Sequence, residues 1–511
     1  MNMRFFLVMF LLLWTPASAV ELRSIEVSGV TLTLGDAINA EVQKRENKRL
    51  SSALLEEIRA SVFQIYSDAG YFARVTFPEQ DLSNGVLRVE VEELSLGEVT
   101  ARAAEGVRFD PVRAEKYVTQ VISSAKPLSI DELDQQSTVL DGLNGIAAEQ
   151  AVSFPLDRAV VDVEISIEGT EFAEFSAQID NFGTESTGRE RASLDAQYNS
   201  LLSLGDRLVL SAAKSDALTS GSFDLEVPVG YRGQRAVVGK SKSEYKINSG
   251  DYKLVGASDR DWMRFRSSEF LILNSPFTIE AGIERSTSID RLNDTTISTD
   301  KSTIDRYLSG SFDWVNSASS AAANVSVRLT FGELDLSRNK NVLVADAKDG
   351  KTHGRYEKLA LSIAGQRKLS PQNSLTLTSA CQFSSKNLDS VSELEISGPS
   401  AVRAYDVAAV SVDQGCFAQT EFVHQQNEQR AFFGFFDLAS GKTNQTTWEN
   451  WNDPGGERNE FSIFGAGVGT RLNIADKFNL SITYAKRLGA CEGCVQAQAQ
   501  DRLWAALTVT F

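Results

Sequence analysis

The chain has 511 residues, a formal net charge of -17 and a hydrophobic fraction of 42%. Its length predicts several domains, and its acidic balance argues against nucleic acid as a partner, because phosphate binding requires a basic surface. All four cysteines lie in the last third of the chain, which excludes a disulfide framework for the whole protein.

The first residues have the pattern of a secretory signal peptide. Arg4 precedes a short apolar run that ends at Trp14, and an Ala-x-Ala cleavage site ends at Ala19. The run is too short to cross a bilayer as a helix, which needs about 20 apolar residues. We therefore expect a signal peptide over residues 1–19 and a mature protein that lives beyond the inner membrane. An uncleaved N-terminal anchor is the alternative.

Residues 20–94 predict a small α+β domain with the order β-α-α-β-β. Of its two helices, the second begins at the N-cap residue Ser51 and ends near Gly70. Alternation of apolar and polar residues predicts the strands. They are expected at 23–30, 72–77 and 85–91.

Residues 95–170 repeat this order. Helices are expected at 112–122 and from the N-cap Ser129 onward, and strands at 97–101, 148–154 and 159–167. A three-stranded sheet with two helices on one face leaves an edge strand free. An extended peptide can join such an edge by β-augmentation.

Residues 171–511 contain only strand patterns separated by polar loops. About sixteen segments alternate apolar and polar residues, as outer-membrane strands do. After residue 19 no apolar stretch approaches the roughly 18 residues of a transmembrane helix. The last strand ends on an aromatic residue, Phe511, which resembles the C-terminal signal of outer-membrane barrels.

The predicted fold class is therefore two α+β domains followed by an all-β transmembrane barrel of about 16 antiparallel strands. The apolar face of each strand suits lipid, and the polar face suits a water-filled lumen. A soluble β-sandwich or solenoid is the alternative, and it would have shorter strands with more uniform spacing.

The cysteines predict a small disulfide loop. Cys491 and Cys494 form a CxxC pair, and the chain has no second CxxC and only two histidines for a zinc site. In an oxidising compartment such a pair is expected to form a disulfide. Cys381 and Cys416 either form a second bridge or remain free.

Several motifs resemble those of the two-partner secretion transporters, also called haemolysin secretion/activation proteins (ShlB/FhaC/HecB-like), within the Omp85 superfamily. The order and spacing of these motifs carry the resemblance, which covers essentially the whole mature chain. They lie at residues 69–75 and 78–82 in the first small domain, at 140–146 in the second, and at 180–183, 187–189 and 204–206 at the barrel entrance.

The most informative match is the segment 398–405. Its residues Val402, Arg403, Ala404 and Tyr405 resemble the family's VRG(F/Y) motif, on a sixth extracellular loop that folds back into the barrel. A second motif, (G/F)xxD on the lumen wall, is resembled by Gly434, Phe435, Phe436 and Asp437.

The resemblance implies an ion pair between Arg403 and Asp437. A guanidinium placed in a crowded lumen needs a carboxylate, and a charge-assisted pair contributes about 1.5–3 kcal/mol. The alternative is that Arg403 is an ordinary solvated loop arginine.

Two features depart from the family pattern. Ala404 stands where the motif has glycine, and alanine would cost about 1 kcal/mol if that position needed a positive φ. Family members usually carry an N-terminal helix that plugs the barrel. Here the first expected strand begins a few residues after Ala19, so we expect no such plug.

The resemblance implies two periplasmic POTRA domains, at 20–94 and 95–170, and an outer-membrane barrel at 171–511. It implies export of a large partner of the haemolysin or adhesin type, which crosses the membrane unfolded and is β-helical once folded. We expect a monomer in contact with outer-membrane lipid and lipopolysaccharide, inserted by the barrel assembly machinery. No cofactor, metal or catalytic residue is expected, because no nucleophile elbow, metal cluster or phosphate loop is present.

Three other functions are weighed against export. An Omp85 assembly factor, or insertase, would use the same loop motif but usually carries a longer POTRA array. A passive porin or receptor would not need POTRA domains. An enzyme-bearing autotransporter would need an added catalytic domain, for which no residues remain.

Overall fold

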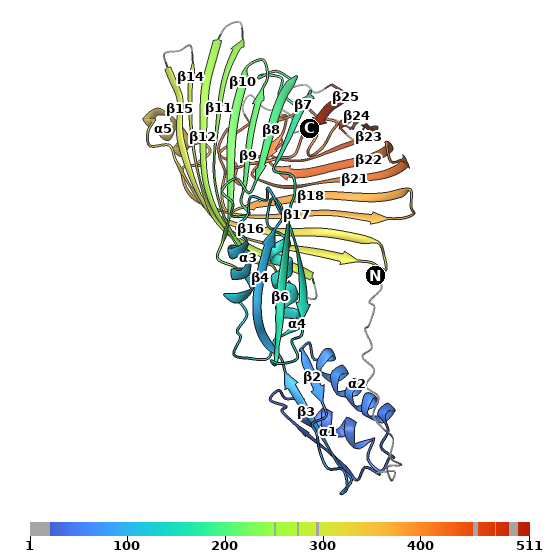
Figure 1. Ribbon diagram of the computed structural model, residues 1–511. Coiled ribbons are helices and arrows are strands. Elements are labelled where there is room, and N and C mark those ends of the chain that lie inside the picture. The colour runs from blue at the N-terminus through green and yellow to red at the C-terminus, as the bar shows by residue number, and fades with distance from the viewer. Residues whose placement is uncertain are drawn as a thin grey trace. The chain divides into compact units, whose positions relative to one another are not determined.

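The computed structural model describes residues 21–249, 252–272, 275–292, 296–452, 458–475, 477–489 and 499–511. The chain separates into two compact units, residues 1–142 with 147–168 and residues 143–146 with 169–511. The first unit holds two small α+β domains and the second holds a closed β-barrel (Figure 1). The expected signal peptide with its cleavage site at Ala19 and the expected Cys491–Cys494 pair lie outside the described residues.

The first small domain has the expected β-α-α-β-β order. Its elements are β1 (Ser24–Ser28), α1 (Gly35–Gln43), α2 (Ser52–Asp68), β2 (Ala73–Thr76) and β3 (Val86–Glu93), and the strands lie in the order β1-β3-β2. The Ser51 hydroxyl accepts the Leu54 N–H at 3.2 Å, which caps α2 as expected. Alternate residues of β3 and one face of each helix form the core. Its fully buried members are Leu22, Ile38, Val42, Ile58, Val62, Tyr66 and Val89.

The second small domain repeats the arrangement. Its elements are β4 (Ser95–Ala103), α3 (Pro111–Thr119), α4 (Ile130–Asp141), β5 (Ile146–Ser153) and β6 (Val160–Gly169), in the strand order β4-β6-β5. Ser129 caps α4 by accepting the Glu132 N–H at 3.4 Å. In each domain the sheet therefore has two edge strands. One of them directly precedes the central strand in the sequence and lies beside it, β2 next to β3 and β5 next to β6.

The motif at residues 69–75 forms the joint between the two small domains. The Gly70 carbonyl accepts the Ile130 N–H at the start of α4, at 2.9 Å. The Arg74 guanidinium donates to the carbonyls of Pro155, Leu156 and Arg158 in the loop after β5. Arg74 therefore ties one domain to the β5–β6 connection of the other.

The barrel contains sixteen membrane-spanning strands within the described ranges, because β12 and β13 both pair with β14 and count as one. Neighbouring strands are antiparallel, and β25 pairs with β7 to close the cylinder. This confirms the predicted fold class. The strands are β7 (Ala173–Asp180), β8 (Arg191–Asn199), β9 (Arg207–Lys214), β10 (Leu218–Val229), β11 (Gln234–Ser249), β12 (Tyr252–Arg266), β13 (Phe270–Ile272), β14 (Ser275–Leu292), β15 (Thr296–Asn316), β16 (Ala321–Asp335), β17 (Gly354–Lys368), β18 (Asn373–Ser384), β21 (Gln414–Asn427), β22 (Arg430–Lys442), β23 (Glu460–Ile474), β24 (Phe478–Leu488) and β25 (Asp501–Thr510).

The closing seam between β25 and β7 is extended by side chains at both ends. The Asn181 side chain accepts the Ala505 N–H at 2.9 Å and donates to the Leu503 carbonyl at 2.8 Å, as a further ladder residue would. At the other end the backbones of Phe175 and Phe511 exchange two hydrogen bonds, and their rings stack at 6.3 Å. The C-terminal phenylalanine therefore completes the seam.

Part of the lumen wall is held by aromatic side chains that lie over glycines. The Trp262 ring on β12 covers Gly239 on β11, where a β-carbon would lie 2.3 Å from the ring, and its indole N–H donates to Asp224 on β10 at 3.0 Å. One side chain thus joins three adjacent strands, an arrangement we call a three-strand staple. The other two staples are Tyr356, Gly332 and Asp305 on β17, β16 and β15, and Tyr245, Gly256 and Asp290 on β11, β12 and β14.

The expectation that residues 171–511 form only strands was wrong at one loop. A helix, α5 (Lys340–Lys348), lies between β16 and β17, and the Asn339 side chain caps it by accepting the N–H groups of Asn341 and Val342. The short apolar run at 342–344 shows no strand or helix period by itself, so the cap decides its conformation. No helix in the described ranges is long and apolar enough to cross a membrane.

Candidate functional site

The loop between β18 and β21, residues 385–413, lies inside the barrel. The chain enters the barrel at β7, so the connections after β7, β9, β11, β14, β16 and β18 lie at the far end, and this loop is the sixth of them. It contains a short hairpin, β19 (Leu394–Glu395) with β20 (Ser411–Val412). Its tip residues Val402, Ala404 and Tyr405 are fully buried and belong to one apolar cluster with residues of β21–β23.

Arg403 is paired with Asp437, as the resemblance implied. Its Nε donates to Asp437 Oδ2 at 2.8 Å and its Nη2 to Oδ1 at 2.6 Å, and its backbone N–H also donates to Oδ2 at 3.1 Å. Asp437 is completely buried and Arg403 is 6% exposed. A two-point pair at this depth fixes the direction of the guanidinium as well as its position.

A second carboxylate, Glu421 on β21, completes the site. It accepts a hydrogen bond from Nη1 of Arg403 and pairs with Nη2 of Arg471 on β23 at 2.7 Å. The two arginines and the two carboxylates make a group with no net formal charge. Because each buried charge has an opposite partner, the desolvation cost of the cluster is offset.

Both arginines stack on phenylalanine rings. The Arg403 guanidinium lies 3.6 Å from the ring centroid of Phe435, and the Arg471 guanidinium lies 4.2 Å from that of Phe433. Under each ring lies a glycine of β23, Gly467 under Phe435 and Gly469 under Phe433. The absence of side chains there lets the rings lie flat, which presents their faces to the cations.

Ala404 is accommodated without backbone strain. It is not among the residues with positive φ, so the cost considered for alanine in place of the motif glycine does not arise. A β-carbon added to Gly465, which faces Asp437 across the strand pair, would lie 2.6 Å from Cβ of Ala404. The space for the alanine methyl group is therefore supplied by the glycine on β23.

Further contacts attach the loop tip to the barrel seam. Asp406 pairs with Arg189 Nη1 at 2.6 Å and with Arg502 on β25. The Trp504 indole N–H donates to the Arg403 carbonyl at 2.7 Å. The motif at 187–189, matched to the family's first hairpin, thus meets the loop through its arginine. The tip is thus attached to β25 and to the connection between β7 and β8.

The four residues of the wall motif point to opposite faces. Phe435 and Asp437 are buried in the lumen, whereas Phe436 is 41% exposed on the outer face, as are its neighbours of the same parity. Gly434 shares the parity of Phe436. Alternation along a strand requires this division, so only two of the four residues touch the loop.

Two acidic groups near the base of the loop have pKa values above their usual range. Burial raises the pKa of Asp413 to about 6, although it accepts the N–H groups of Leu388 and Gln445. Burial, together with repulsion from Asp413 and Asp389, raises the pKa of Glu393 to about 7. A charge on Glu393 is therefore unfavourable in this position at neutral pH.

Cys381 and Cys416 form a disulfide, which settles one alternative left by the sequence. They face each other directly on β18 and β21, with Cα atoms 4.0 Å apart. Cys381 has the parity of Leu375, Leu377 and Phe383, which are exposed on the outer face. The bridge joins the two strands that flank the sixth loop.

The sequence alone did not identify Glu421, Arg471, Asp406 or the glycines of β23. The charged residues of the site lie on four separate elements. Glu421 and Arg471 follow Arg403 by 18 and 68 residues, and no local sequence pattern marks a lumen-facing charge as the partner of so distant a loop. The spacing Gly465-x-Gly467-x-Gly469 is a visible signal, because glycine at alternate strand positions leaves one face without side chains.

Comparisons with known proteins give matches to two family models. A family model described as haemolysin secretion/activation protein ShlB/FhaC/HecB matches residues 161–472, and one described as POTRA domain, ShlB-type, matches residues 20–93. The heme/hemopexin transporter protein HuxB of Haemophilus influenzae (strain 86-028NP) is 20% identical over 480 residues, which cover 91% of this chain and 82% of HuxB.

Two solved structures share the fold. CdiB from Escherichia coli has a TM-score of 0.73 and 18% identity, covering 97% of this chain and 91% of its own. BamA from Haemophilus ducreyi lacking POTRA domains 1–3 has a TM-score of 0.53 and 14% identity, covering 96% of this chain and 100% of its own. Both likenesses extend over nearly the whole of this chain.

Proposed function

Because this chain belongs to the family of haemolysin secretion/activation proteins ShlB/FhaC/HecB, which are two-partner secretion transporters of the outer membrane, we propose that it exports an unfolded partner protein through its barrel. The partner would cross the inner membrane by the general secretory route, meet the POTRA domains in the periplasm, and fold after it leaves the cell. The name of HuxB describes a heme/hemopexin transporter; for this chain we propose a large β-helical partner of the haemolysin or adhesin type.

The loop pinned by Arg403 supports the proposal most strongly. Arg403, Asp437 and Glu421 hold the tip against β21–β23 in the lumen, where a passing chain would travel. Removing one partner of a buried ion pair costs about 3–5 kcal/mol, so the tip has one strongly preferred position. A fixed loop shapes the channel, and a released loop would move freely within it.

The edge strands of the POTRA domains offer a place for an unfolded partner. β5 is an edge of its sheet, and Val152 on it is 39% exposed. An extended segment can add to such an edge through backbone hydrogen bonds, which require no particular sequence. The Arg74 joint beside the β5–β6 loop would hold this edge in a constant orientation to the first domain.

The remaining lumen wall suits a passing chain because several of its charges are already paired. Arg264 pairs with Asp224 at 2.5 Å, and Arg235 pairs with Glu226 at 2.8 Å. A wall of compensated charges attracts neither an acidic nor a basic segment strongly. No nucleotide is available in the periplasm, so folding of the emerged partner, worth about 5–15 kcal/mol per domain, would give the movement its direction.

An outer-membrane assembly factor is the second candidate, since BamA shares the fold at a TM-score of 0.53. The presence of two POTRA domains, rather than a longer array, favours export. A passive porin is disfavoured because it has no use for POTRA domains. We propose no catalytic role for any residue.

The test is deletion of the gene in its own host, followed by complementation. Export predicts that one large protein disappears from the medium and returns with the wild-type gene, while other outer-membrane barrels assemble normally. A general loss of barrels would identify an assembly factor and would overturn the export proposal.

A further inference from the structure

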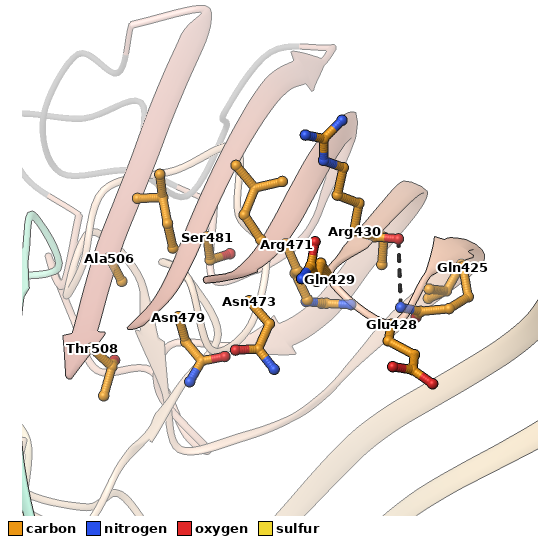
Figure 2. Close-up of a pocket in the computed structure, with 14 residues that line it drawn as sticks. Gln425, Glu428, Gln429, Arg430, Arg471, Asn473, Asn479, Ser481, Ala506 and Thr508 are labelled. Atoms are coloured by element: carbon orange, nitrogen blue, oxygen red, sulfur yellow. Dashed lines mark hydrogen bonds between the residues drawn. The ribbon is translucent and has the colours of Figure 1, made fainter. Parts of the chain in front are cut away.

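A hollow of about 280 Å³ lies in the lumen at the periplasmic end of β21–β25, the orange and red strands of Figure 1. It is bordered by the turn after β21 and by the lumen-facing ends of β23, β24 and β25. These are the ends on the side where the chain enters the barrel. Figure 2 shows the side chains that these strands and the turn contribute to its lining.

Two amide side chains lie side by side in this hollow. Asn473 on β23 and Asn479 on β24 face each other in register, and Figure 2 shows their amides next to one another. The Oδ1 atom of Asn473 is buried and has no hydrogen-bond partner among the described residues. A buried acceptor without a partner costs about 1–3 kcal/mol, so a ligand that donates an N–H there would bind favourably.

Small side chains leave the space open. Ala431, Ser481 and Ala506 line the hollow between the amides. Its charged side chains include Arg471, which already pairs with Glu421, and Glu428 and Arg430 at the turn. The hollow therefore has hydrogen-bonding capacity and little net charge, which suits a neutral polar ligand better than an ion.

The hollow adjoins the pinned loop. Arg471 and Ser481 line it and also line the neighbouring cavity that contains Arg403 and Glu421. A chain that entered from the periplasmic side and bound at Asn473 would lie directly below the loop tip. The next part of the lumen that such a chain would meet is the site formed by Arg403 and Glu421.

We propose that this hollow is a staging site, in which an extended segment of the exported chain is bound through its backbone before it passes the loop. The inference rests on the proposed export function and adds the binding place. Side-chain amides of Asn473 and Asn479 can pair with the N–H and C=O groups of any extended chain, as a neighbouring strand would. Such recognition tolerates the varied sequence of a long exported protein.

The test measures binding of a fluorescein-labelled, unstructured peptide of Gly, Ser, Asn and Thr to the purified full-length protein in detergent, by fluorescence anisotropy. The same peptide with a methylated backbone serves as the ligand control. Asn473→Leu and Asn479→Leu are compared with Asn324→Leu, which removes a lumen-facing amide at the same end of the barrel but outside the hollow, on β16. Heat-modifiable migration in gels verifies that each variant remains a folded barrel.

We expect the unmodified peptide to bind about fivefold more weakly to each of the two hollow variants, as the loss of one hydrogen bond implies. Binding to Asn324→Leu should equal that of the wild type, and the methylated peptide should not bind. Added salt should change the affinity little, because the contacts are between neutral groups.

The proposal is overturned if the folded hollow variants bind the peptide as the wild type does, or if the methylated peptide binds equally well. A marked loss of affinity with salt would also overturn it, since binding would then depend on charge. These outcomes leave the export function untouched, because secretion of the partner by the wild-type gene is measured separately in cells.

Discussion

Two stretches of the lumen wall use the same pairing of aromatic rings with glycines for different ends. Between β10 and β17 three rings, those of Trp262, Tyr356 and Tyr245, each cover a glycine on the next strand and reach a carboxylate on the strand after it, so this wall is held by its own side chains. Between β21 and β25 the rings of Phe433 and Phe435 also lie over glycines, but their free faces are covered by Arg471 and Arg403.

The difference separates a structural wall from a functional one. A staple needs nothing beyond its three strands, so it stabilises the barrel whatever the loop does. The second wall leaves buried carboxylates, Asp437 and Glu421, that require the arginine of the loop. Changes to the second wall should therefore alter export, and changes to the first should alter stability alone.

The largest effect is expected from breaking the buried pair. Arg403→Ala and Asp437→Ala should each reduce export to near background, because either change leaves a buried charge without its main partner, at about 3–5 kcal/mol. The double variant should be little worse than either single one, since the two residues act as a unit. The measurement is partner protein in the medium, normalised to barrel in the membrane.

Arg328→Ala is the matched control for that experiment. Arg328 is also a lumen arginine stacked on an aromatic ring, Tyr307, at 4.0 Å, but it belongs to the first wall. It should export normally. Additive losses for the Arg403 and Asp437 variants, or an equal loss for Arg328→Ala, would remove the distinction between the walls.

The next largest effect is expected at the contact of the loop with β23. Gly465→Ala would place a methyl group 2.6 Å from Cβ of Ala404 and should displace the tip, lowering export several-fold. Adding Ala404→Gly removes one of the two clashing methyl groups and should restore most of it. If the double variant exports no better than Gly465→Ala alone, the loop does not lie against β23 as described.

A smaller and purely structural effect is expected on the first wall. Trp262→Phe keeps an aromatic ring over Gly239 but loses the hydrogen bond to Asp224, which contributes about 1 kcal/mol. The unfolding temperature of the barrel, read from heat-modifiable migration, should fall by a few degrees while export stays normal. Reduced export at unchanged stability would show that this wall also takes part in transport.

The smallest effect is expected from pH at the base of the loop. Because burial raises the pKa of Glu393 to about 7, its ionisation disfavours the native loop progressively from about pH 4.3, the usual unfolded value, up to the raised pKa. Glu393→Gln should therefore resist proteolysis in the loop better than the wild type at pH 8 and equally well at pH 4. An advantage at low pH alone would contradict the sign.

The sequence predicted those features that depend on local periodicity. Strand alternation, the N-caps Ser51 and Ser129 and the two β-α-α-β-β domains each follow from neighbouring residues, and the resemblance supplied Arg403 and Asp437. The short helix α5 was not predicted, because its apolar run is too short to reveal a helical period. The domain limits at 94 and 170 and the cleavage at Ala19 remain predictions.

Glu421, Arg471 and the role of Gly465 could not be predicted in the same way. Their function depends on which strands become neighbours and on which residues face each other across the ladder. A shift of register by one residue would turn each of them to lipid. Long-range register is thus the information that a single sequence does not supply.

The central claim is that the sixth loop lies against β21–β23 inside the barrel, and a cysteine crosslink tests it most directly. The Gln419 side chain donates to the Ala401 carbonyl at 2.7 Å, so Ala401→Cys with Gln419→Cys should be joined by a short bifunctional thiol reagent in protein assembled in the outer membrane. Ala401→Cys with Asn324→Cys, on β16 and three strands away from Gln419 around the barrel, should not. Crosslinking of the second pair, or of neither pair in correctly assembled barrel, would contradict the claim.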